Sequence, residues 1–150
     1  MFVFSIKTSK KQLVSLLLCL AALAGIILLA VSWPSEPVSV TVPAPDEDAR
    51  VEYLQQLGYQ PGATHSEVRE VLIPDEFDEV FTQYNELQKV AGMDLLPYHG
   101  KRAKVYTYRI FNHPQGSDVA AHLYVYDNKI IGGDISSTAM NGFMTGLIQL

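Results

Sequence analysis

Two patterns of hydrophobic residues divide the chain. Residues 13–33 contain no charged side chain, whereas from residue 46 onward apolar and polar residues alternate with helical or strand periods. A helix of these 21 residues rises about 32 Å, close to the ~30 Å hydrocarbon thickness of a bilayer. Trp33 suits the headgroup interface, and Pro34 cannot continue the helix. The first pattern therefore predicts a transmembrane helix over residues 13–33.

Charges on either side of this segment predict its orientation. Three lysines precede it, namely Lys7, Lys10 and Lys11. No base occurs in the fifteen residues that follow it, so the positive-inside rule places residues 1–12 in the cytoplasm and residues 34–150 outside. A cleaved signal peptide is the alternative, because Ala30 and Ser32 have the spacing of a cleavage site. The apolar segment is longer than a typical signal peptide core, which favours a single-pass anchor in the cell membrane.

A proline-rich segment separates this helix from the remainder. Residues 34–45 contain four prolines, and we expect an extended, partly stiff spacer. Residues 46–150 then form one extracytoplasmic domain, long enough to bury a single core.

Two helices are predicted in this domain. The first begins near Asp46–Asp48 and ends at Gly58. The second has Asp75 as its N-cap and ends at Gly92. Their apolar residues recur at three- and four-residue spacing, which places them on one face of each helix. These residues are Val51, Leu54 and Leu57 in the first helix and Phe77, Val80, Phe81, Tyr84, Leu87 and Ala91 in the second.

Four strands are predicted from runs of β-branched and aromatic residues, at 66–73, 104–111, 119–127 and 129–136. In the first strand, Val68, Val71 and Ile73 are expected to point inward. Residues 139–150 are expected to form a loop and a short closing turn. The order of helix, strand, helix and three strands predicts an α+β domain. Two helices would pack on one face of an antiparallel sheet of about four strands.

Charge and composition exclude several functions. Residues 34–150 carry eight bases and sixteen acids, a net charge of −8, which is unsuited to binding nucleic acid. Cys19 is the only cysteine, so no disulfide can form within the chain. The four histidines show no metal-ligand spacing: His65, His99, His113 and His122. We therefore expect no metal site and no cofactor.

The sequence Gly132-Gly133-Asp134 is the first candidate site. Two glycines inside a strand allow a bulge or the close approach of another backbone, and Asp134 would then bond loop amides. A loop that contacts a ligand is the alternative. Ser136 or Ser137 with His122 and Asp134 would suit a hydrolase, but no Gly-x-Ser-x-Gly motif marks a nucleophile. We therefore predict that the protein is not an enzyme.

Four tyrosines are the second candidate site. Tyr106, Tyr108, Tyr124 and Tyr126 alternate on two predicted neighbouring strands, where they would form one stripe. Such a stripe either fills the core beneath the helices or forms an exposed aromatic surface for a partner or a glycan.

Residues along the domain together resemble the uncharacterised family called domain of unknown function 4830. The resemblance covers residues 46–147. It is carried by Val71-Leu72-Ile73-Pro74, Phe77-Asp78, Tyr84-Asn85, Leu87-Gln88-Lys89, Gly92, Asp94-Leu95, Tyr98, Gly100-Lys101, Tyr106-Thr107-Tyr108, Val125-Tyr126, Ile130-Ile131-Gly132-Gly133-Asp134, Asn141-Gly142-Phe143-Met144 and Gly146-Leu147. The family occurs in small membrane-anchored proteins of Gram-positive bacteria. The resemblance implies no activity, cofactor or catalytic residue.

These features favour a membrane-anchored extracytoplasmic module that binds a protein or another component of the cell envelope. A cell-envelope hydrolase or carbohydrate-active enzyme with a site near Asp134 is the alternative. The two predict different surfaces, because a binding module presents a flat or grooved apolar surface and an enzyme presents a polar pocket.

Overall fold

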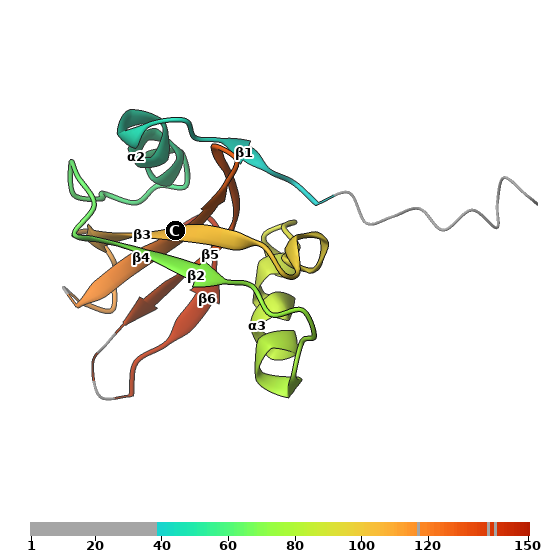
Figure 1. Ribbon diagram of the computed structural model, residues 1–150. Coiled ribbons are helices and arrows are strands. Elements are labelled where there is room, and N and C mark those ends of the chain that lie inside the picture. The colour runs from blue at the N-terminus through green and yellow to red at the C-terminus, as the bar shows by residue number, and fades with distance from the viewer. Residues whose placement is uncertain (1–38, 117, 138, 140) are drawn as a thin grey trace, which may run out of the picture. The chain divides into compact units, whose positions relative to one another are not determined.

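The computed structural model describes residues 39–116, 118–137, 139 and 141–150 (Figure 1). The predicted cytoplasmic segment, the transmembrane helix with Lys7, Lys10 and Lys11, and the first part of the spacer lie outside the described residues. The elements are β1 Val42–Pro43, α2 Glu47–Gln56, β2 Glu67–Leu72, α3 Glu79–Val90, the 3₁₀ helix η1 Leu96–Tyr98, β3 Arg102–Ile110, β4 Val119–Tyr126, β5 Lys129–Ser137 and β6 Met144–Gly146. Within the described residues, no helix has the length and apolar character needed to span a bilayer.

The strands form one antiparallel sheet in the order β1-β5-β4-β3-β2, with β6 also paired to β5. The α+β class and the antiparallel sheet are thus confirmed, although the sheet has six strands rather than about four. Two short strands share the outer edge of β5: β1 pairs with Lys129 and Ile130, and β6 pairs with residues 134–136. These strands have two and three residues, too few for the alternation of a strand to be visible in the sequence.

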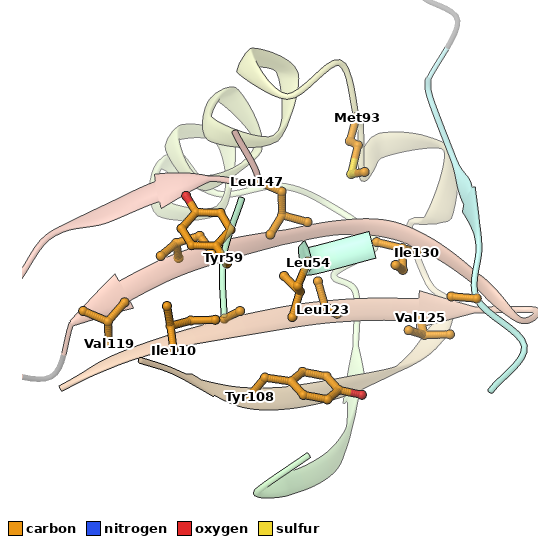
Figure 2. Close-up of a cluster of buried hydrophobic side chains, with 13 residues drawn as sticks. Leu54, Tyr59, Met93, Tyr108, Ile110, Val119, Leu123, Val125, Ile130 and Leu147 are labelled. Carbon is orange, nitrogen blue, oxygen red and sulfur yellow. The ribbon is translucent and has the colours of Figure 1, made fainter. Parts of the chain in front are cut away.

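The two helices cover opposite faces of the sheet (Figure 1). Leu54 of α2 packs with Tyr108 and Leu123, whereas Phe81 of α3 packs with the cluster that contains Ala103. Successive residues of a strand point to opposite faces, so Tyr108 and Ala103 of β3 lie on different sides. The expectation that both helices cover one face is therefore wrong. The larger core lies on the α2 face (Figure 2).

Both helices begin at an aspartate, but only one begins where predicted. Asp46 caps α2 and accepts a hydrogen bond from the amide of Ala49 at 2.9 Å. The cap of α3 is Asp78, not Asp75, and it accepts from the amide of Phe81 at 2.7 Å. Phe77 lies before this cap and packs edge-on against Phe81, with 4.6 Å between ring centroids. The helix therefore begins three residues later than predicted, and the contact between Phe77 and Phe81 spans its start.

Both ends of the described chain are held against the sheet. The expected spacer is only partly separate from the domain, because the amide of Val40 donates to the carbonyl of Gly92 and Ala44 is buried. The C-terminal segment was expected to be a loop, but it forms β6 and buries Leu147. In β2, Ile73 is buried just beyond the strand, whereas Val68 is exposed, because β2 is an edge strand.

Candidate functional site

Helix α3 turns two amide side chains toward the protein interior. The Asn85 amide donates to the Asp94 carboxylate at 2.7 Å and accepts from the amide of Leu95 at 2.8 Å. The Gln88 side-chain oxygen accepts from the amide of Gly133 at 2.6 Å. Both side chains are buried, so these bonds fix the helix to β5 and to the segment before η1.

Apolar residues of the same helix are left at the surface. Val80 is 75% exposed, although the helical pattern predicts an inward position, and Phe81, Tyr84 and Leu87 are only partly buried. They line a groove of about 550 Å³, which we call the α3 groove. Its lining residues are Val80, Phe81, Gln83, Tyr84, Leu87, Tyr124 and Met144. The volume is within the range of small-molecule and peptide-side-chain pockets.

A polar centre adjoins the α3 groove. The Tyr84 hydroxyl donates to one oxygen of Asp134 at 2.8 Å, and Nδ1 of His122 lies 3.0 Å from the other. Asp134 is only 4% exposed, so these partners supply the hydrogen bonds that a buried carboxylate requires. A smaller pocket of about 160 Å³ joins this centre to Arg69, and it shares Tyr84, Tyr124 and Met144 with the groove.

The tyrosines of this centre are held in their neutral form. Burial raises the pKa of Tyr84, and the neighbouring charge of Asp134 raises it further. Burial also raises the pKa of Tyr124. Since a neutral hydroxyl is a hydrogen-bond donor, Tyr84 stabilises the Asp134 carboxylate and is unsuited to act as a base near neutral pH.

The two glycines before Asp134 have a packing role. An added Cβ at Gly132 would lie 2.9 Å from the side-chain oxygen of Gln88, and one at Gly133 would collide with the carbonyl oxygen of His122. The register between β4 and β5 shifts by one residue at Tyr124, so a bulge adjoins these glycines. A bulge beside these glycines and the close approach of the His122 backbone to Gly133 are both present, the two alternatives named for a pair of glycines within a strand. Asp134 differs from the prediction, because it bonds side chains rather than loop amides.

Ser136, His122 and Asp134 do come together, but not as a catalytic relay. Ser136 Oγ lies 3.4 Å from Nδ1 of His122, the same ring nitrogen that faces Asp134. A serine hydrolase needs the carboxylate and the serine on different ring nitrogens, because the proton passes through the ring. The three residues meet because His122 and Asp134 are cross-strand partners and Ser136 is two residues further along β5.

The four candidate tyrosines do not form one stripe. Val105 pairs with Tyr124, whereas Tyr106 pairs with Leu123, so the two pairs of tyrosines lie on opposite faces. Tyr106 and Tyr108 lie on the α2 face, where Tyr108 is fully buried. Tyr124 and Tyr126 lie on the α3 face, and only Tyr124 lines the α3 groove. The register of β3 and β4 separates them, and the sequence alone did not reveal that register.

The sequence missed the residues that complete this site. The partnership of Tyr84 with Asp134 joins residues fifty positions apart, and Arg69 and Met144 enter from β2 and β6. One signal was available, namely the polar Asn85 and Gln88 within an apolar helix. Within the described residues, no group of three or more histidine, cysteine or acidic side chains is placed to hold a metal ion.

Comparison with known proteins gives the family alone. No curated protein and no solved structure matches the chain significantly. The model of the family described as Domain of unknown function (DUF4830) matches residues 53–135. This match includes α3, its buried amides and the sheet from β2 to Ile135 of β5. Because it spans more than half of the sequence, the chain belongs to the DUF4830 family.

Proposed function

We propose that the protein is a membrane-anchored extracytoplasmic module that binds an apolar segment of an envelope protein in the α3 groove. Residues 13–33 would form the anchor, with residues 1–12 in the cytoplasm. The apolar segment and the preceding lysines support this topology. The module would act by presenting its groove outside the membrane, without catalysis.

The observation that carries the binding role is the exposure of apolar residues on both sides of the groove. Val80 of α3 is 75% exposed and Met144 of β6 is 49% exposed. Burying one such side chain against a partner contributes about 1.5–3 kcal/mol. Leu87 and Phe81 line the same groove, so a single apolar side chain of a partner would contact several residues.

Among the described residues, no contact near Asp134 favours the hydrolase alternative. The buried carboxylate is already hydrogen-bonded to Tyr84 and His122, and Ser136, the serine found beside His122 in the described part of the chain, faces the same ring nitrogen as Asp134. Tyr84, with its raised pKa, fixes Asp134 rather than activating a nucleophile. These groups therefore support a structural role for the polar centre beneath the binding groove.

Site-specific photo-crosslinking in living cells tests this function. A photoreactive residue replaces Val80 or Met144 in the groove, or the exposed Glu52 of α2 as the matched control. We expect the same partner to be captured from both groove positions and not from position 52. A second change, Leu87→Asp, should abolish this product. Equal products at all three positions, or none in the groove, would contradict the proposed function.

The topology is tested separately. A cysteine introduced between residues 34 and 45, with Cys19 replaced by serine, should react with a membrane-impermeant thiol reagent on intact cells. A cysteine placed between residues 1 and 12 should react only after the cells are lysed. The reverse pattern would overturn the proposed orientation.

A further inference from the structure

A second pocket, with Arg50 of α2 in its wall, has a mostly polar lining. Its volume is about 300 Å³, and we call it the polar pocket. It is lined by Ala44, Pro45, Arg50, Glu70, Arg102, Lys104, Tyr106, Val125, Tyr126, Asp127 and Asn128. It shares no lining residue with the α3 groove, so it is independent of the function proposed above.

Arg50 is held rigidly at the wall of this pocket. The residue is 6% exposed, and its guanidinium carbon lies 3.9 Å from the centre of the Tyr106 ring. Nε donates to the Tyr108 hydroxyl at 2.9 Å, and Nη2 donates to Glu47 at 3.3 Å. These bonds use two of the five N–H donors, and the described residues supply no partner for the others. A planar guanidinium fixed in this way is preorganised for an oxyanion.

In the described part of the chain, the ion pairs around the polar pocket leave its lysine free to bind an anion. Glu47 is shared, because it also accepts from the backbone and ring of His65 at 2.8 and 2.7 Å. Glu70 forms an ion pair with Arg102 at 3.0 Å. Among the described lining residues, Arg50 and Arg102 each have an acidic partner, and Lys104 is the cation without an ion pair. The remaining acid is Asp127, in the exposed turn between β4 and β5.

We propose that the polar pocket binds a phosphate ester that also carries hydroxyl groups, that is, a polyol or sugar phosphate. The phosphate oxygens accept hydrogen bonds from Arg50 and Lys104, the pairing that guanidinium and ammonium groups favour. Asp127 is an acceptor only, so it selects a neighbouring hydroxyl and repels a second anionic group. A pocket of about 300 Å³ is at the small end of ligand sites, which suits a ligand of this size.

Isothermal titration of the full chain in nonionic detergent micelles tests this site with glycerol 1-phosphate as the probe. Lys104→Gln should weaken binding at least about fivefold, because a charge-assisted contact is lost. Lys101→Gln makes the same charge change outside the pocket lining and should alter the dissociation constant less than about twofold. Arg50→Lys keeps the charge but removes the planar fork, and we expect binding about tenfold weaker. Near-ultraviolet circular dichroism verifies that each variant is folded, and Lys104→Gln carries the test if Arg50→Lys unfolds.

Two further probes identify the source of the ligand. Inorganic phosphate should bind more weakly than glycerol 1-phosphate, and Asp127→Asn, which replaces the charged acceptor by a weaker neutral one, should reduce this difference. Dihexanoylphosphatidylglycerol below its micelle concentration presents the same chemistry as a lipid headgroup. If it binds as well as the free ester and responds to Lys104→Gln, a lipid source is supported, whereas preference for the free ester supports a soluble source. Equal weakening by Lys104→Gln and Lys101→Gln, or equal binding of phosphate and ester, overturns the proposal.

Discussion

Substitution of Gln88 is the best single test of how α3 is fixed to the sheet. Its side-chain oxygen accepts from the Gly133 amide at 2.6 Å, and the residue is fully buried. Gln88→Met keeps the length of the side chain but removes the acceptor. The Gly133 amide then stays buried without a partner, which costs about 1–3 kcal/mol. The lost 3.4 Å bond from Gln88 Nε2 to the carbonyl of Tyr84 is long and adds little.

We therefore expect Gln88→Met to lower the free energy of unfolding by about 2 kcal/mol, or the midpoint of thermal unfolding by about 8 °C for a domain of this size. Urea unfolding in nonionic detergent, followed by near-ultraviolet circular dichroism, measures this change. All eight tyrosines lie after residue 50, so their signal reports this domain.

Gln83→Met is the matched control, because Gln83 lies on the same helix and is exposed. It should change the free energy of unfolding by less than about 0.5 kcal/mol. A Gln88→Met protein as stable as the wild type, or equal losses in both variants, would refute the reasoning.

Three further changes test neighbouring parts of the structure. Gly133→Ala places a Cβ against the carbonyl of His122, and we expect a loss of more than about 3 kcal/mol, measured by urea unfolding. Tyr84→Phe removes the donor to the buried Asp134 carboxylate and should lower the free energy of unfolding by about 1.5–3 kcal/mol. An unchanged free energy of unfolding would show that this hydrogen bond does not stabilise the fold. Burial acts to raise the pKa of Glu47, but hydrogen bonds from His65 and Tyr108 hold it below 4.5. Its stabilising effect is therefore present above pH 4.5 and is lost as the pH falls through the lowered value, so Glu47→Gln should flatten the acid side of the stability profile.

Much of the fold follows from local sequence signals. Asp46 and Gly58 bound the first helix as predicted, with Gly58 at a φ of 89°, which glycine adopts readily. Asp127 and Asn128 also have positive φ, as a tight turn between two strands requires. The long strands β3, β4 and β5 were predicted within about two residues of their ends. Each of these features depends on residues that are close together in the chain, so it can be predicted from the sequence.

The candidate site was predicted less well, because its contacts join distant segments. The glycines were named as a place for a bulge or a close approach of another backbone, whereas Tyr84 was assigned only to a helical face. Val80 was expected inside and is exposed, because the buried amides of Asn85 and Gln88 rotate the helix away from its apolar pattern. Hydrophobic periodicity is read from one helix alone. It therefore cannot predict a helix orientation that depends on hydrogen bonds to other segments.

The sequence alone determined the family, the α+β class, the cap of α2 and the turn between β4 and β5, since each depends on residues that are close along the chain. It also predicts the membrane anchor, which lies outside the described residues. Only the tertiary structure decided the strand register, and a register specifies which residues share a face. It placed Tyr106 and Tyr124 on opposite sides of the sheet and brought His122 beside Asp134. The α3 groove and the polar pocket exist only because segments far apart in the chain meet, and their long-range contacts leave no periodic signal in the sequence.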